Sequence, residues 1–143
     1  MILKKPKFWQ KKDSLISIIL FPLTWIVLLT IFLKKKIIKP IKFNIPIICV
    51  GNIYIGGTGK TPVSIFLAKK LSEMGIKTAI IRKYYKSHLD EHNLIKDNFN
   101  NLILNKDRAK GIKKAEQTNY DSVILDDGFQ DYKINKNLNI ICF

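Results

Sequence analysis

Short apolar runs alternate with longer mixed segments along this chain, and this pattern predicts strands joined by helices. The first run, residues 45–50, is continuously apolar, as expected for a strand that is buried on both faces. The five predicted strands cover residues 45–50, 78–81, 102–104, 122–125 and 138–143.

Two of the intervening segments predict helices. Apolar side chains, Phe66 among them, recur at helical spacing over residues 63–74, and Gly75 follows as a C-terminal stop. A second helix is predicted over residues 108–117. Residues 82–100 are polar and show no clear period, so the pattern predicts no regular element there.

Strands joined by helices imply right-handed crossovers, and therefore an α/β fold with a mostly parallel sheet and helices on both faces. Ligands of such sheets bind beyond the carboxyl ends of the strands. A glycine-rich loop over residues 51–61 and the pair Asp126–Asp127 each follow a predicted strand directly. We therefore expect the loop and the two aspartates at one edge of the sheet.

A separate apolar block, residues 15–33, precedes the sheet; its 19 uncharged residues lie between two groups of five lysines. As an ideal helix it would be about 28 Å long, close to the thickness of a hydrocarbon core. The equal lysine groups give no orientation, so a spanning helix and a helix or hairpin in one leaflet, bent at Pro22, both stay open. A buried core helix is the weaker alternative. We expect residues 1–42 to form a basic-flanked membrane anchor and residues 43–143 a separate domain.

The charge of the chain adds little to this picture. Lys and Arg number 25 against 11 acidic residues, and only Arg82 and Arg108 are arginines. Aromatic residues do not interleave with the lysines as stacking surfaces do, so we expect no nucleic-acid partner. Cys49 and Cys142 lie in apolar runs outside any C-x-x-C pair, which predicts buried free thiols in a reducing compartment.

The loop GNIYIGGTGKT, residues 51–61, carries the clearest chemistry. A strand, a glycine loop and a helix start ending in Gly-Lys-Thr form a phosphate cradle, in which Lys60 can reach β- and γ-phosphates and the Thr61 hydroxyl can bind Mg²⁺. The alternative is a glycine-rich turn with a solvated Lys60. The usual first glycine of the P-loop pattern falls on Tyr54, so this is a variant P-loop. The predicted cofactor-binding residues are Gly56, Gly57, Thr58, Gly59, Lys60 and Thr61, with Thr61 also a metal ligand.

Asp126 and Asp127 follow an apolar strand, as a Walker B acid does. A phosphoryl-transfer site needs a carboxylate there to hold Mg²⁺ directly or through water, so both are predicted metal ligands. Asp-Asp-Gly is also good turn chemistry by itself, which is the alternative. His88, Glu91 and His92 fit the inverted zinc-protease pattern H-x-x-E-H, but no third ligand is evident, and two histidines in a polar loop is the better interpretation.

Together, the GGTGKTP segment at 56–62, preceded by Gly51-Asn52, and the DDGFQ segment at 126–130 resemble the tetraacyldisaccharide 4'-kinase family, the membrane-associated lipid A kinases of Gram-negative bacteria. The resemblance implies a P-loop kinase that transfers the γ-phosphate of ATP to the 4'-hydroxyl of a tetraacyldisaccharide 1-phosphate. It implies a lipid A disaccharide precursor and membrane lipids as partners, with no obligate protein partner. It also implies the bacterial inner membrane as location, with the catalytic domain on the cytoplasmic side.

Residue by residue, the resemblance aligns the family's Gly-Asp-Glu with residues 89–91. Asp90 is then the candidate base for the sugar hydroxyl, beside Lys60 as the other catalytic residue, and Glu91 is a candidate metal ligand; a solvated loop is the alternative for Asp90. Where the family has Arg-Gly-Tyr-Gly, residues 82–85 read Arg-Lys-Tyr-Tyr, and Asp131 stands where the family has His.

The resemblance covers only the front part of the family's length, so we expect the C-terminal part of the kinase domain to be missing. Two other functions stay open on the sequence. One is a truncated nucleotide-binding remnant without turnover, and the other is a different P-loop ATPase or switch protein of the deviant type.

Overall fold

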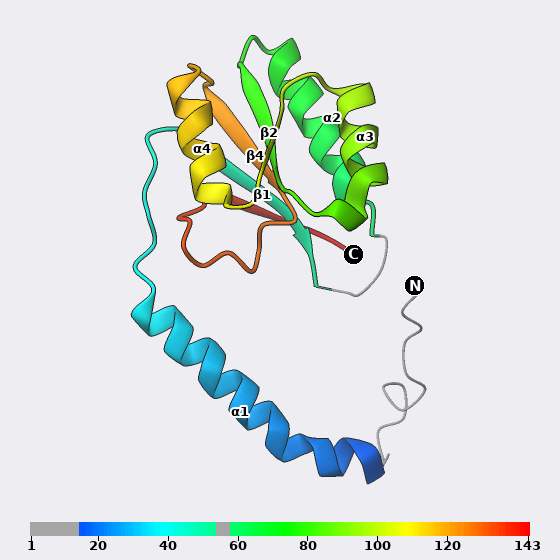
Figure 1. Ribbon diagram of the computed structural model, residues 1–143, viewed down its shortest axis with the longest axis vertical. Helices are drawn as coiled ribbons and strands as arrows, with labels where there is room; N and C mark the ends of the chain where they lie inside the picture. Colours follow the sequence, from blue (N-terminus) through cyan, green and yellow to red (C-terminus); the bar gives the residue numbers. More distant parts are fainter. Residues whose placement is uncertain (1–14, 54–57) are drawn as a thin grey trace. The chain divides into compact units, whose positions relative to one another are not determined.

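The computed structural model of the protein describes residues 15–53 and 58–143, and the chain divides into two compact units, Met1–Lys39 and Pro40–Phe143 (Figure 1). Each unit is described by itself. The described part of the first unit contains one helix, and the second unit contains the five strands.

The helix of the first unit, α1, spans Leu15–Ile37 and contains Pro22. It extends beyond the predicted apolar block, which ends at residue 33, and its last turn contains Lys34, Lys35 and Lys36. The hydroxyls of Thr24 and Thr30 donate to backbone carbonyls of their own helix, so they add no unsatisfied polar group. A 20-residue window of α1 has a mean hydropathy of 2.0 and, by length and composition, is sufficient to cross a membrane.

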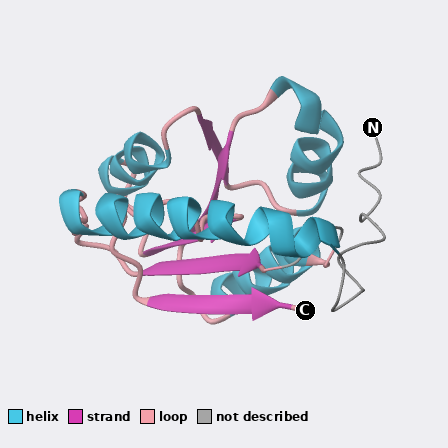
Figure 2. Ribbon diagram, turned by 90° about the horizontal axis from the view of Figure 1, so that it is seen from below, coloured by secondary structure: helices cyan, strands magenta, loops and turns pink. Residues whose placement is uncertain are grey.

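The second unit is built on a five-stranded parallel sheet in the order β3-β2-β4-β1-β5, which confirms the predicted α/β class. Figure 2 shows the edge strand that ends at the chain terminus running the same way as its neighbour. The strands are β1 (Ile47–Asn52), β2 (Thr78–Lys83), β3 (Leu102–Asn105), β4 (Ser122–Asp126) and β5 (Leu138–Cys142).

Helices cover both faces of the sheet. The helix α4 (Arg108–Gln117) lies on one face, and α2 (Lys60–Glu73) and α3 (Leu89–Asn98) lie on the other (Figure 1). Successive side chains along a strand point to opposite faces of the sheet. Ile81 packs toward α4, whereas Ile80 packs toward α2 and α3. Both faces of the sheet are therefore covered by apolar packing, which explains why the strand sequences are continuously apolar.

The predicted stop of α2 is confirmed by its hydrogen bonds. Gly75 has φ +83°, and its N–H donates to Ser72 O at 3.0 Å while Ile76 N–H donates to Leu71 O at 3.0 Å. This is a Schellman motif, which satisfies the last carbonyls of the helix.

The face of α2 that meets the sheet is only partly the predicted one. Phe66 is exposed, whereas Ser64, Ile65 and Ala68 are buried against the sheet. Small side chains at Ser64 and Ala68 let the helix approach the strands closely, and a pattern that counts only large apolar residues misses them.

Residues 82–100, where no regular element was predicted, contain the end of β2, a 3₁₀ turn η2 (Lys86–His88) and the helix α3. That prediction was wrong because α3 buries only His92 and Ile95, three residues apart. Two buried positions in ten residues give no visible period, and one of them is a histidine. The packing of α3 against α2 and the sheet stabilises this helix, although its own sequence shows no helical period.

The carboxyl ends of β1 and β4 form the topological switch point of this sheet. The connection from β1 leads to β2 on one side, and the connection from β4 leads to β5 on the other, while β1 and β4 are direct neighbours. In open α/β sheets the crevice at such a point is where ligands bind.

His92 gives the fold a predictable dependence on pH. The ring is buried and stacked on Tyr84 with centroids 5.6 Å apart, and burial, followed by the nearby Arg82 charge, lowers the pKa of His92. Below the unfolded-state pKa of about 6.5, the unfolded chain binds a proton that the folded chain does not, so the unfolding free energy falls as pH falls. We expect His92→Phe to reduce this slope between about pH 7 and about pH 5 in urea unfolding of the full chain in detergent. Identical slopes in the two proteins would contradict it.

Candidate functional site

The candidate site lies where the N-terminus of α2 meets the carboxyl ends of β1, β2 and β4. Gly59 precedes α2 with φ +74°, a left-handed conformation that glycine adopts without strain. The first N–H groups of a helix have no partner within it and carry the positive end of its dipole, so they suit an anion. Of the predicted phosphate-binding residues, Thr58 to Thr61 surround this helix start, whereas Gly56 and Gly57 lie outside the described residues.

Arg82, at the end of β2, connects the site. Its Nη1 donates to Asp126 and, at 3.2 Å, to Thr61 Oγ1. Its Nη2 pairs with Glu91 and lies 3.4 Å from His88 Nδ1. The arginine is only 5% exposed and Asp126 is fully buried, so their contact is shielded from water, whereas the Glu91 side chain is 49% exposed.

Asp126 is fully buried, and both of its carboxylate oxygens are satisfied. Oδ2 faces Arg82 and accepts the Thr61 hydroxyl at 3.2 Å, and Oδ1 accepts the Ser64 hydroxyl at 3.0 Å. A buried carboxylate is stable only with such a cation and hydrogen bonds. The pair of contacts from Thr61 and Ser64 fixes the first turn of α2 against β4.

Lys60, the residue before Thr61, makes a second set of contacts. Its Nζ lies 2.9 Å from Asn52 Oδ1, at the end of β1, and 3.2 Å from Asp127 Oδ1. Asp127 adopts φ +62°, which turns it out of β4 and leaves its side chain 53% exposed. Lys60–Asp127 and Thr61–Asp126 therefore form two adjacent pairs, one open to solvent and one buried.

The two sequence motifs touch through their glycines. A Cβ on Gly51 would lie 2.8 Å from the ring of Phe129, and one on Gly128 would lie 2.9 Å from Leu125 Cβ and 3.1 Å from Cys49 Sγ. Both positions therefore need glycine for close packing of β1 against the turn after β4. Burial raises the pKa of the Cys49 thiol to about 11, and both cysteines are buried and free, as predicted.

The oxygen ligands predicted for Mg²⁺ are partly brought together. Two oxygens bound at roughly 2.0–2.1 Å on adjacent corners of an octahedral ion lie about 3 Å apart. Thr61 Oγ1 and Asp126 Oδ2 are 3.2 Å apart, so this pair fits. Glu91 instead contacts Arg82, and no cluster of three His, Cys, Asp or Glu placed for a metal occurs among the described residues.

Two further sequence hypotheses have different outcomes. Asp90 lies exposed in the first turn of α3 and makes no ion pair within the described ranges, so its assignment as a base stays a prediction. For the alternative zinc pattern, His92 is buried against Tyr84 while His88 faces Arg82 and Glu91. With no third ligand in the described part of the chain, the two histidines do not form a zinc site.

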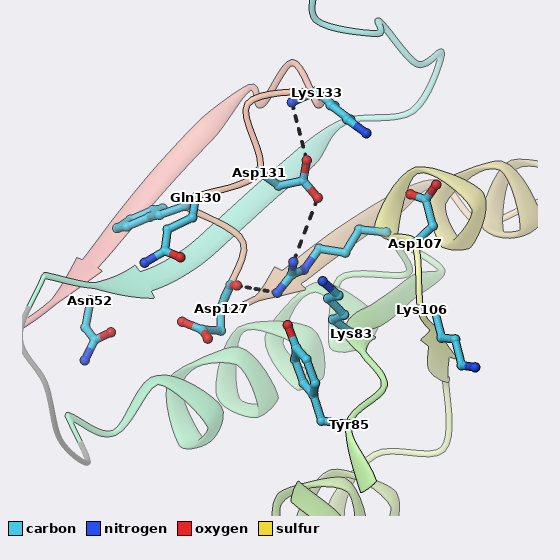
Figure 3. Close-up of a pocket in the computed structure, with 11 residues that line it drawn as sticks. Asn52, Lys83, Tyr85, Lys106, Asp107, Asp127, Gln130, Asp131 and Lys133 are labelled. Carbon is cyan, nitrogen blue, oxygen red and sulfur yellow. Dashed lines mark hydrogen bonds and ion pairs between the residues drawn. The ribbon is translucent and has the colours of Figure 1, made fainter. Parts of the chain in front are cut away.

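A cavity of about 520 Å³ opens beside these contacts (Figure 3). It starts at Asn52 and Asp127 and extends past the ends of β2 and β3. Its wall also includes the connection from β4 to β5. The residues that line it are Asn52, Lys83, Tyr85, Lys106, Asp107, Arg108, Asp127, Phe129, Gln130, Asp131 and Lys133.

Arg82 is the central residue for which sequence reasoning predicted no role. One signal could have found it: only two arginines occur among 25 basic residues, and both lie at this site. The second, Arg108, donates to the backbone carbonyl of Asp127 at 2.5 Å. A lysine-rich chain that keeps arginine at two positions uses it where planar, multiply bonded donors are needed.

Comparisons with known proteins agree with these motifs. Residues 16–143 match a family model described as LpxK, tetraacyldisaccharide-1-P 4'-kinase. The chain is 41% identical to a tetraacyldisaccharide 4'-kinase of Pelagibacter ubique, covering 100% of this chain and 45% of that protein. It is 37% identical to one of Aliarcobacter butzleri, covering 92% and 46%. The chain thus spans about half the length of the curated relatives it matches.

A solved structure matches as well. The crystal structure of LpxK from Aquifex aeolicus in complex with ATP aligns with a TM-score of 0.69 and 26% identity. The alignment covers 89% of this chain and 49% of that one. The match supports the same α/β architecture, and again for the N-terminal part of the longer protein.

The buried ion pair should dominate the stability of the site. Arg82→Met leaves the Asp126 carboxylate buried without its cation, so we expect the unfolding free energy to fall by about 3 kcal/mol. Adding Asp126→Asn should restore part of that loss, because the uncompensated charge is then gone. Urea unfolding of the full chain in detergent measures both.

The control removes an ion pair of the same kind at the surface. Lys70 and Glu73 pair at 2.7 Å with both side chains more than half exposed, so Lys70→Met should change stability by about 0.5 kcal/mol or less. Equal losses for Arg82→Met and Lys70→Met would show that burial does not strengthen the Arg82 contact.

Proposed function

Since the chain belongs to the tetraacyldisaccharide-1-P 4'-kinase family, we propose that it binds ATP and phosphorylates the 4'-hydroxyl of a tetraacyldisaccharide 1-phosphate in lipid A biosynthesis. One observation carries the proposal: the consecutive residues Lys60 and Thr61, at the start of α2, contact the consecutive residues Asp127 and Asp126. A phosphoryl-transfer site needs this meeting of phosphate ligands with carboxylates.

In this proposal the helix start binds the phosphates of ATP. Thr58, Gly59 and the first N–H groups of α2 surround them, and Lys60 reaches the β- and γ-phosphates. Gly56 and Gly57 stay predictions from the sequence. Lys60 Nζ is held by Asn52 and by the half-exposed Asp127, so it can exchange the aspartate for a phosphate oxygen without leaving the site. Most of the rate acceleration comes from such fixed charges at the transferring group.

Thr61, Asp126 and Asp127, with Glu91 as a further candidate, would hold Mg²⁺. The ion would neutralise charge on the β- and γ-phosphate oxygens. Arg82 holds Asp126 and Glu91 on one guanidinium, so it keeps these two carboxylates within reach of the same place. Its role is positioning, since it contacts both carboxylates and is itself only 5% exposed.

Asp90 is the proposed base for the acceptor hydroxyl. It is exposed in the first turn of α3, next to Glu91, which reaches Arg82. A base needs only one carboxylate oxygen within hydrogen-bond distance of the hydroxyl, and an exposed side chain leaves room for an acceptor to approach.

We also propose that α1 attaches the chain to the bacterial inner membrane, with the second unit on the cytoplasmic side. The helix presents large apolar side chains such as Phe21, Trp25 and Phe32, each more than 60% exposed. The acyl chains of a lipid A precursor stay in the bilayer, so an anchor in the same chain as the kinase domain keeps enzyme and acceptor on one surface.

The first test concerns catalysis. Lys60→Met should lower the rate of phosphate transfer by about 100-fold or more, because a charge aimed at the transferring group is lost. The assay is transfer of labelled γ-phosphate from ATP to a tetraacyldisaccharide 1-phosphate by the full chain in detergent. Lys69→Met, on the exposed side of α2, is the matched control and should keep the wild-type rate.

The same assay separates the alternative functions. ATP binding that depends on Lys60 but yields no lipid product would refute kinase activity for this chain and favour a nucleotide-binding protein without turnover. ATP hydrolysis that is independent of the disaccharide would favour a different P-loop ATPase.

The second test concerns the anchor. The full chain should float with vesicles of phosphatidylethanolamine and phosphatidylglycerol, and Val27→Asp with Leu28→Asp should abolish flotation, since each aspartate in the middle of a helix opposes insertion by about 3 kcal/mol. Lys113→Asp with Lys114→Asp on α4 introduces the same residues on an exposed helix and should float normally. Flotation of the α1 variant would show that this helix is not the anchor.

A further inference from the structure

The cavity beside Asp127 carries positive charge that its own carboxylates do not compensate. Four cationic side chains and three carboxylates line it. The cations are Lys83, Lys106, Arg108 and Lys133, and the carboxylates are Asp107, Asp127 and Asp131.

Each of the three carboxylates already has a partner. Asp107 Oδ1 accepts a backbone N–H in the first turn of α4 at 2.9 Å. Asp127 Oδ1 lies 3.2 Å from Lys60 Nζ, and Asp131 Oδ2 lies 3.8 Å from Arg108 Nη1. Their charge is therefore directed to a helix start, to the phosphate-binding lysine and to the arginine of the cavity wall.

The three lysines differ from these acids. Their ammonium groups form no ion pair within the part of the chain that the structure describes. Lys83 has a further contact, because its Nζ lies 5.3 Å from the centre of the Tyr85 ring, and a cation over an aromatic face is attracted to it. Both side chains extend from the end of β2 toward Asp127 (Figure 3). A cavity of about 520 Å³ that is lined by such unpaired cations has the features of a site for a small-molecule anion.

Resting on the proposed kinase function, we infer that this cavity binds the phosphate that the acceptor already carries, with Lys83 as the principal contact. The family description gives the acceptor as a disaccharide 1-phosphate, so it has an anionic group remote from the hydroxyl that reacts. Asp127 borders the cavity and also contacts Lys60, so an acceptor whose hydroxyl lies near Lys60 has the rest of its head group directed into the cavity. Lys106 and Lys133 add charge around the phosphate, and the Tyr85 hydroxyl can donate to it.

Binding, measured separately from turnover, tests this inference. The full chain in detergent is titrated with tetraacyldisaccharide that carries the 1-phosphate and with the same lipid without it. The wild type should bind the phosphorylated lipid at least about 10-fold more tightly than the lipid without the phosphate, because the second lipid cannot make the charge-assisted contact. Lys83→Met should abolish that preference, and Lys83→Arg should keep most of it.

The controls distinguish folding and the source of the phosphate. Lys86→Met changes an exposed lysine three residues away that does not line the cavity, and it should bind like the wild type. ATP affinity should be unchanged in Lys83→Met, which shows that the variant is folded. Separate Lys106→Met and Lys133→Met variants should each reduce the preference about 3-fold, since they add charge without being the main contact.

Three outcomes would overturn the inference. One is equal affinity of the wild type for the two lipids. Another is weaker ATP binding in Lys83→Met, which would assign the cavity to the nucleotide. The third is Lys83-dependent binding of inorganic phosphate as tight as that of the phosphorylated lipid, which would make it a free-phosphate site. A preference for the phosphorylated lipid without product formation would support the inference and refute only the kinase activity of this chain.

Discussion

The ion pair between Arg82 and the fully buried Asp126 is the contact on which the rest of the site depends. Removing a carboxylate from water is costly unless a cation and hydrogen bonds replace its hydration. Arg82 supplies the cation from β2, and Thr61 and Ser64 supply hydroxyls from α2. One buried charge therefore holds two strands and a helix start in a fixed arrangement, and Glu91 extends that arrangement to α3.

Close packing at the β1–β4 junction provides the second constraint. Gly51 lies against the Phe129 ring and Gly128 lies against Leu125 and Cys49, so neither position has room for a Cβ. The two motifs that are far apart in sequence are thus parts of one contact surface. The left-handed turn at Asp127 then directs its carboxylate to Lys60 instead of into the core.

These two constraints divide the site into a buried half and an open half. Thr61 and Asp126 belong to the buried half, where water is excluded and charges interact strongly. Lys60 and Asp127 belong to the open half, which continues into the cationic cavity. The proposed transfer of a phosphoryl group from ATP to a membrane lipid needs such an arrangement, because the phosphates require fixed ligands while the acceptor must enter from outside.

The sequence by itself determined the α/β class, the positions of the five strands, the C-terminal stop at Gly75 and the motifs that identify the family. These features follow from local rules: apolar runs, helical spacing and glycine where φ is positive. It did not reveal α3, because two buried side chains give no period. Nor did it reveal the role of Arg82, because its buried partners Thr61 and Asp126 are 21 and 44 residues away on other elements. The lysines of the cavity looked like part of a general basic excess. Only the tertiary structure showed which of them lack an acidic partner among residues 15–53 and 58–143, because compensation of charge depends on distances between elements that the chain order does not specify.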